Sequence, residues 1–512
     1  MKRIIFIAGI LLMLCGLTLG AWAASPDGEV FTDTDQLRGR TVGVITGGTT
    51  AILTEEYFDG EVNFEYFNQN TDMIAALDAG KIDAYVMDMY GAQFQCEEHP
   101  NQTVLAPAIK QAPAGFIFRK DDPDAAALRG EINEYLAAIR ADGTYDEVYD
   151  IWMGKDESKK VVDLDFSGER GELVMGSSTN IGSPFCFMLN GKMVGLELDI
   201  AARFCREYGY SLRFEDYDYG ALINAVASGK VDFAGDSVMV TPERAESVDF
   251  SDETCLMGFV AVARKGAADA EQSGFFAKIA SSFEKTFLRE SRWKLFLNGI
   301  ANTLLITVLS VVLGTALGFG AYMSCRRGNR IADALVRFFS WLIHGMPVVV
   351  FLMILFYIVF GKSSVSGLWI SVLAFTLVFA VAFTAMLRAG VAAVNPGQLE
   401  AALALGYPER RAFMNFILPQ AALHMLPTYK AELVSLIKST AIVGYIAVQD
   451  LTKVSDIIRA RTYEAFFPLI ATAIIYFLLA WALIECVKLV DIRTDRRRRS
   501  SEQIVKGVQT HD

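Results

Sequence analysis

The sequence predicts a two-lobed α/β domain followed by an all-α membrane domain. The chain has 512 residues, and its apolar residues are unevenly spread. Residues 26–290 have the composition of a soluble acidic protein, whereas long apolar runs dominate from about residue 294 onward. Residues 36–264 alternate short β-type runs with helical patterns, which is typical of α/β folds. The change in composition marks the main domain boundary.

The first residues have the pattern of a secretory signal. Lys2 and Arg3 form a charged start, an apolar run continues to about Leu19, and Ala21-Trp22-Ala23 supplies the small residues that precede a cleavage site. We therefore expect a signal peptide over residues 1–23, which would export the α/β domain. A retained membrane anchor is the alternative.

Charge and composition argue against several functional classes. The net charge of −12 argues against nucleic acid binding. The 4 histidines are scattered, so we expect no metal site. The sequence lacks the Gly-x-x-x-x-Gly-Lys-Ser/Thr loop, so ATP should not bind by that motif, and we expect no cofactor on this chain. We expect isolated thiols among the exported cysteines, although pairing stays open. They are Cys96, Cys186, Cys205 and Cys255.

Short elements fill the exported half. The length suits a domain that binds a ligand in a cleft between two lobes. The predicted helices include Ala125–Ala141 and Leu196–Tyr208. The predicted strands are Thr41–Ile45, Asn63–Phe67, Ala84–Asp88, Glu172–Gly176, Leu212–Glu215 and Phe233–Ser237.

Five membrane spans are predicted in the second half. A helix needs about 20 mostly apolar residues to cross a bilayer. Four runs meet this requirement, and a fifth contains Lys430, Glu432 and Lys438, which would face the interior of the helix bundle. For the fifth run, an amphipathic helix on the membrane surface is the alternative. The segments are 296–323, 334–360, 366–388, 428–449 and 466–490.

The distribution of arginines supports five spans. Arg326-Arg327, Arg410-Arg411 and Arg496–Arg499 fall on one side of the membrane only if the number of spans is five. Basic loops face the cytoplasm. Residues 294–492 therefore form the membrane domain, residues 493–512 a cytoplasmic tail, and residues 266–293 a linker from the exported half.

One cytoplasmic segment has an unusual pattern. Residues 400–421, EAALALGYPERRAFMNFILPQA, predict a short helix, a break at Gly406-Tyr407-Pro408 and a second helix. The segment is too polar to span the membrane and too apolar for a solvated loop. Such a helix pair suits docking on a cytoplasmic partner; an ordinary amphipathic connector is the alternative.

This segment resembles the EAA motif of ABC importer permeases. Residues 344–352, HGMPVVVFL, and 436–451, LIKSTAIVGYIAVQDL, resemble the polar amino acid permeases of the histidine/glutamine type. The resemblance covers about residues 290–492 and implies that the motif couples the chain to an ATPase subunit. The matching motif residues are Glu400, Ala401, Ala402, Gly406, Leu418 and Pro419.

The exported half resembles family 3 of the bacterial extracellular solute-binding proteins, with its parts in permuted order. The segments GELVMGSSTNIGSPF and VDFAGDSVMVTPER, which open that family's sequences, begin here only at residues 171 and 231. Each family segment occurs once, so we expect one circularly permuted domain over residues 36–265. Permutation is tolerated where termini lie close together on the surface. The expected parts are the second lobe (36–120), the closing helices of the first lobe (121–154), a joint (155–170) and the first lobe (171–264).

The resemblance also implies a site. Arg244 would bind the carboxylate of an amino acid, for which a guanidinium offers a bidentate fork, and Asp88 would bind the ammonium group. Thr179 stands where the family often has an acid that binds a basic ligand side chain, which favours an uncharged or acidic amino acid. The further candidates are Ser237, Thr49, Thr50 and Tyr219.

Together these features imply the binding and membrane-spanning subunit of an ABC importer for a polar amino acid. The chain would be a multi-pass protein of the cell membrane, surrounded by lipid, with its binding domain outside the cytoplasm. A separate ATPase would hydrolyse ATP, so the chain itself would not be an enzyme. The chain would pair with a second permease as a homodimer or heterodimer. The alternatives are a ligand-gated amino acid receptor or channel, and a dehydratase-like enzyme on a binding-protein fold.

Overall fold

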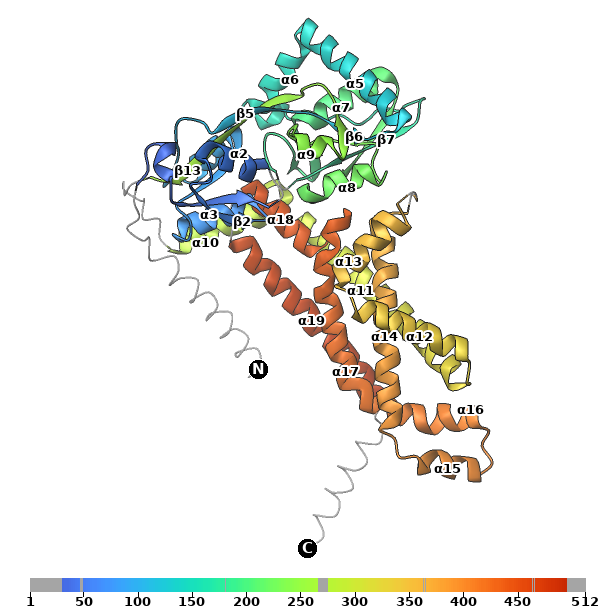
Figure 1. The fold of residues 1–512 in the computed structure, drawn as a ribbon. Coiled ribbons are helices and arrows are strands. Elements are labelled where there is room, and N and C mark those ends of the chain that lie inside the picture. The colour runs from blue at the N-terminus through green and yellow to red at the C-terminus, as the bar shows by residue number, and fades with distance from the viewer. Residues whose placement is uncertain are drawn as a thin grey trace. The chain divides into compact units, whose positions relative to one another are not determined.

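The computed structural model describes residues 30–494, except residues 47–48, 180, 266–274, 362, 364, 463 and 465 (Figure 1). The expected signal peptide, Arg496–Arg499 and most of the expected tail lie outside the described residues. The chain forms two compact units. One holds the α/β domain up to Phe296 together with Gly361–Ser363 and Val454–Leu469, and the other holds Leu297–Phe360, Ser364–Lys453 and the segment from Ile470 onward.

Lobe 2 of the α/β domain is built on a six-stranded sheet. The strand order is β2-β1-β3-β13-β4, and β5 pairs with β13. β1, β2 and β3 run parallel, and β13 runs antiparallel to β3. Three helices follow the parallel strands, namely α2 (Thr49–Phe58), α3 (Asn70–Asp78) and α4 (Met89–Glu98). The strands are β1 (Thr41–Ile45), β2 (Asn63–Phe67), β3 (Ala84–Asp88), β4 (Gln102–Val104), β5 (Lys110–Ala114) and β13 (Cys255–Arg264).

Lobe 1 is built on a five-stranded sheet with the order β10-β7-β11-β6-β12. β7 runs parallel to both β10 and β11, and a hairpin of β8 and β9 lies outside this sheet. The strands are β6 (Ile117–Arg119), β7 (Glu172–Ser177), β8 (Phe187–Leu189), β9 (Lys192–Val194), β10 (Ser211–Asp216), β11 (Phe233–Ala234) and β12 (Val248–Phe250). The helices are α5 (Pro123–Asp142), α6 (Thr144–Met153), α7 (Leu196–Tyr208), α8 (Leu222–Ala227) and α9 (Pro242–Ala245).

The two-lobed α/β fold is confirmed, but the chain crosses between lobes at other points than expected. β6 belongs to lobe 1, although residues 36–120 were assigned to lobe 2. β13 belongs to lobe 2, although residues 171–264 were assigned to lobe 1. The reason is pairing: β13 is almost wholly buried between β3, β4 and β5.

The two crossings lie side by side. Ser251 donates its amide to Phe116 at 2.9 Å, and Thr254 donates its amide to Ala114 at 2.8 Å. Backbone segments that pair in this way form a natural hinge, because only a few φ and ψ angles need to change when the lobes move.

Helices α5 and α6 pack onto lobe 1, to which residues 121–154 were assigned. α5 begins at Asp122, whose side chain accepts the amides of Asp124 and Ala125, and Pro123 occupies its first turn. In α6, the fully buried Trp152 donates its indole N–H to Asp199 of α7 at 3.0 Å. The packing joins segments that lie on either side of the joint in the sequence.

Two predicted segments differ most from their expected form. The strand expected at Phe233–Ser237 ends at Ala234, because Ser237 adopts a left-handed φ of 53° that no regular strand permits. The expected linker at residues 266–293 is partly helical. It contains α10 (Phe275–Phe283), a π-helix η4 (Glu284–Leu288) and a 3₁₀ turn η5 (Arg289–Ser291).

Among the residues that the structure describes, three helices of the membrane half are long and apolar enough to cross a membrane, and two bent helix pairs raise the number to five if each pair counts as one span. All five predicted spans fall on these segments. The three long helices are α11 (Trp293–Arg326), α14 (Gly367–Ala392) and α19 (Phe467–Thr494). Within the second unit, α11 approaches α14 closely at Gly314 and Gly318, where an added Cβ would meet Phe379 and the carbonyl of Ala380.

The second predicted span is bent rather than continuous. α12 (Arg330–His344) and the run formed by α13 (Val348–Met353) and η6 (Ile354–Val359) meet at 111°. Pro347 lies at the bend and precedes the first residue of α13. Proline lacks an N–H and disfavours helical geometry in the residue before it, so the helix stops there.

The fourth predicted span continues directly from the second helix of the cytoplasmic segment. α16 (Glu409–Ala412), η7 (Phe413–Ile417), α17 (Leu418–Ser439) and η8 (Thr440–Ile446) form one helical run. It meets α18 (Leu451–Thr462) at 55°. Pro419 lies in the first turn of α17, directly after the π-turn η7.

Candidate substrate-binding site

The lobe 2 candidates lie at the carboxyl edge of a parallel sheet. β1 and β3 are neighbours in register, and Thr50 and Asp88 lie where these strands end. Ligands of such sheets bind outside the carboxyl ends of the strands. Thr50 is buried, and its hydroxyl has no hydrogen-bond partner among the described residues. Thr49 starts α2, and its side chain lies outside the described part of the chain.

Asp88 is a buried carboxylate at the first turn of α4. Its Oδ1 accepts the amide of Gly91 at 2.6 Å, and only 8% of the residue is exposed. Burial raises the pKa of Asp88 to about 6, against the opposing effect of backbone hydrogen bonds. Gly91 permits the close approach, because a Cβ there would lie 2.7 Å from Asp88 Oδ2. A cationic ligand would stabilise the ionised form of such a desolvated carboxylate.

The lobe 1 candidates occupy the corresponding edge of the other sheet. Thr179 follows β7, and Ser237 follows β11, at the carboxyl ends of parallel strands. Thr179 is buried and donates its amide and its hydroxyl to Asp216 at 3.0 and 2.9 Å. The hydroxyl proton of Thr179 is therefore already donated to Asp216, and only the lone pairs of the hydroxyl oxygen could accept a hydrogen bond from a ligand.

Ser237 is held by a carboxylate that the sequence did not reveal. Its amide donates to Glu197 Oε2 at 2.7 Å, and Glu197 also accepts the hydroxyl of Thr254 in the crossing segment. Glu197 is fully buried, and burial raises its pKa. Acids in the first turn of a helix usually face solvent and favour the helix dipole, so no pattern marked Glu197 as a buried group.

Arg244 and Tyr219 meet in lobe 1. Arg244 lies in the short helix α9, where Thr241 accepts its amide, and its guanidinium donates to the carbonyl of Met239 at 3.3 Å. The guanidinium carbon lies 5.8 Å from the ring centre of Tyr219. Burial raises the pKa of the Tyr219 hydroxyl, and the positive charge of Arg244 opposes this rise. The aromatic face and the carbonyl orient the guanidinium.

The candidate residues thus form two groups, one at the carboxyl edge of each sheet. Asp88 and Thr50 belong to lobe 2. Arg244, Tyr219 and Ser237 belong to lobe 1, where Thr179 also lies. Of the cysteines in the exported half, Cys96 is partly buried, and Cys186, Cys205 and Cys255 are buried.

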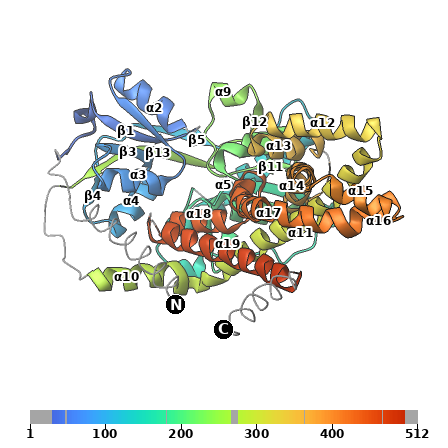
Figure 2. The ribbon, with the colours of Figure 1, turned by 90° about the horizontal axis from the view of Figure 1, so that it is seen from below.

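The cytoplasmic segment forms the expected helix pair. α15 (Gly397–Ala404) and α16 lie side by side in both views (Figure 1 and Figure 2). Between them Gly406 adopts a φ of 83°, a left-handed conformation that favours glycine. Arg326 at the end of α11 pairs with Glu409 at 3.0 Å and stacks on the ring of Phe413. Leu405 at the tip is 77% exposed, which leaves an apolar contact point.

Two families match separate parts of the chain. Residues 314–496 match the family described as binding-protein-dependent transport system inner membrane component. Residues 34–155 match the bacterial extracellular solute-binding proteins, family 3. A putative glutamine transport system permease protein, GlnP, of Rickettsia conorii is 31% identical over 198 residues, which cover 38% of this chain and 89% of that protein.

The chain belongs to the family of amino acid ABC transporter permeases.

Other relatives of this permease are also amino acid permeases by name. The arginine transport system permease protein ArtQ of Bacillus subtilis is 33% identical over 192 residues, covering 36% of this chain and 86% of that protein. The histidine/lysine/arginine/ornithine permease HisM of Escherichia coli is 29% identical over 206 residues, covering 38% and 87%. A crystal structure of an amino acid ABC transporter with histidines is 29% identical, covers 43% of this chain and 99% of its own, and has a TM-score of 0.36. The permease is an inner membrane component, and its solute-binding domain is extracytoplasmic.

Proposed function

We propose that this permease subunit captures a polar amino acid with its own extracytoplasmic domain and passes it inward, using ATP hydrolysed by a separate subunit. The observation that carries the proposal is the union, in one chain, of a two-lobed solute-binding fold and a permease half with an exposed helix pair, α15–α16. The relatives are named for transport of glutamine, arginine and related amino acids.

The two groups of candidate residues suit the two charged ends of an amino acid. Arg244 would bind the carboxylate, because its guanidinium is already oriented by Tyr219 and the carbonyl of Met239. Asp88 would bind the ammonium group, because a buried carboxylate is stabilised by a nearby cation. Ser237, Thr50, Thr49 and Thr179 would supply polar contacts. The crossings at residues 115–116 and 251–254 would let the lobes close around the ligand.

The helix pair α15–α16 would dock on the ATPase. Leu405 and Tyr407 are exposed at its tip, so the pair offers an apolar contact surface. Glu400, Ala401 and Ala402 lie on α15, and Pro419 begins the helical run that continues toward the membrane. A movement of the ATPase would therefore pass along this run. Two permease domains per transporter, as a homodimer or heterodimer, would match a pair of ATPases.

Uptake by the complete transporter tests the proposal. The permease is purified with its ATPase from host membranes, reconstituted in vesicles, and supplied with ATP and single labelled amino acids. We expect inward transport of at least one polar amino acid, with an uncharged or acidic side chain, that stops when ATP is omitted. A full panel without ATP-dependent uptake would refute the proposed function.

A further inference from the structure

Two arginines of α18 make buried contacts with the binding domain. α18 lies in the permease half of the sequence, yet its residues from Val454 onward belong to the compact unit of the α/β domain. Arg459 pairs with Asp72 and donates to Gln69 at 3.0 Å. Its side chain is only 6% exposed. Gln69 and Asp72 form the start of α3, so Arg459 holds lobe 2.

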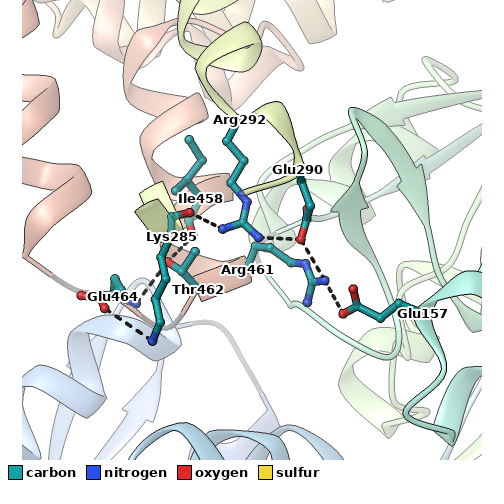
Figure 3. Close-up of polar contacts among 8 residues, drawn as sticks. All are labelled: Glu157, Lys285, Glu290, Arg292, Ile458, Arg461, Thr462 and Glu464. Carbon is teal, nitrogen blue, oxygen red and sulfur yellow. Dashed lines mark hydrogen bonds and ion pairs between the residues drawn. The ribbon is translucent and has the colours of Figure 1, made fainter. Parts of the chain in front are cut away.

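Arg461 makes the second contact, on the side of lobe 1 (Figure 3). Its Nη2 donates to Glu157 at 2.5 Å and to Glu290 at 3.2 Å, and its guanidinium carbon lies 5.0 Å from the ring centre of Phe187. Glu157 belongs to the joint of residues 155–170, and Phe187 belongs to the hairpin of lobe 1. The segment of residues 155–170 thus supplies an anchor.

The linker completes the network. Arg292 is 5% exposed, pairs with Glu290 at 2.7 Å and donates to the carbonyl of Lys285. Lys285 in turn pairs with Glu464 at 3.7 Å, just after α18 (Figure 3). Glu290 and Ser291 both adopt a φ of 55°, which is unfavourable for residues other than glycine. Such a turn persists where surrounding contacts determine it, and here Glu290 bridges two arginines.

We propose that α18 is a latch that holds both lobes and the linker at once through Arg459 and Arg461. The two arginines lie two positions apart on one helix, so both anchors can be engaged together only within a narrow range of lobe–lobe arrangements. A change in the angle between the lobes must therefore strain or release α18, whose chain continues into the membrane unit at Lys453. The two arginine side chains are 6% and 14% exposed, whereas Asp72 and Glu157 are 40% and 46% exposed. Loss of a carboxylate partner therefore leaves a largely buried cation without that partner, which favours undocking. The inference rests on contacts within this chain and holds for any solute.

Hydrogen–deuterium exchange on the full-length chain in detergent tests the latch. One arginine is replaced, and amide exchange is measured at the contact that the other arginine makes. Arg461→Gln is expected to speed exchange at residues 69–75, and Arg459→Gln at residues 284–292. We expect each exchange rate to rise by about tenfold, which corresponds to a loss of about 1.4 kcal/mol of docking free energy. Arg461→Lys should keep exchange at residues 69–75 slower than Arg461→Gln does, because it leaves a cation beside Glu157 and Glu290.

Lys155→Gln is the matched control, since Lys155 pairs with Glu97 between two well-exposed side chains. It should change neither region, and exchange in β1 and β7 should stay slow in every variant that folds. Changes confined to the substituted anchor would show two independent contacts and overturn the latch. Unchanged exchange in both regions, or equally fast exchange at residues 69–75 in Arg461→Lys and Arg461→Gln, would also overturn it. These readings need no ligand and no ATPase, so their failure leaves the transport test unaffected.

Discussion

Replacing Asp88 by asparagine should stabilise the ligand-free permease and abolish amino acid binding. The pKa of Asp88 is raised from 3.8 to about 6 by burial. Below pH 3.8 the carboxyl is protonated in both the folded and the unfolded chain. As the pH rises toward and through 6, the unfolded chain loses its proton first, so the folded state becomes relatively less stable. At about 1.4 kcal/mol per pKa unit, the cost at pH 7 is about 3 kcal/mol.

Asparagine removes this cost, because it is neutral and its side-chain oxygen can still accept the amide of Gly91. About 3 kcal/mol corresponds to a rise in Tm of about 6–12 °C for a domain of this size. Thermal unfolding of the full-length chain at pH 7 and pH 4 measures it, and the gain should disappear at the lower pH. Asp83→Asn is the control, because Asp83 also accepts a backbone amide, that of Thr41 at 2.9 Å, but caps no helix. A Tm for Asp88→Asn that is equal to or below the parent at pH 7 would refute the reasoning.

Three further predictions follow from the same contacts. Affinity of the parent chain for its amino acid should fall about tenfold per pH unit below pH 6, because protons compete for Asp88, as titration calorimetry across pH would reveal. Gly406→Arg should abolish coupling between ATP hydrolysis and uptake but leave binding intact, whereas Gly328→Arg, also at a positive φ in open space, should transport normally. Glu197→Gln should fold with near-parent stability, whereas Glu197→Leu should lose about 1–3 kcal/mol in chemical unfolding, since the Ser237 amide loses its acceptor.

Regular elements were predictable wherever the local pattern agreed with the tertiary contacts. β1, β2, β3 and α7 have the predicted bounds. β1 and β3 are short runs of largely buried residues, as expected for strands of a sheet that is covered on both faces. The EAA segment folds as a helix pair around Gly406, because a glycine and a proline interrupt two helical runs. These are local properties that one sequence can carry.

Properties that depend on distant partners were missed. β13 could not be assigned to lobe 2 from its apolar sequence, because the partner strands β3, β4 and β5 lie more than 140 residues earlier in the chain. The contact of Arg461 with Glu157 joins residues 304 positions apart, and no periodicity encodes it. The bend at Pro347 was visible in principle, but hydropathy alone merged α12 and α13 into one span.

The pairing of Arg244 with Asp88 across the ligand is the central prediction about the site. The two residues lie in different lobes, each at the carboxyl edge of its sheet, and each would meet one charged end of an amino acid. Truncating one partner of a buried charge pair costs about 2–5 kcal/mol, or roughly 30- to 5,000-fold in affinity. Arg213→Ala is the control, because Arg213 is an exposed arginine of the same lobe that pairs with Glu172 and Glu215.

The most direct measurement is calorimetric titration of the full-length permease in detergent with a panel of amino acids, followed by the variants Arg244→Ala and Asp88→Ala with the best ligand. We predict that each variant loses at least about 30-fold in affinity while it remains folded, and that Arg213→Ala binds like the parent. Binding of both variants within about threefold of the parent, below roughly 0.7 kcal/mol, would contradict the assigned site.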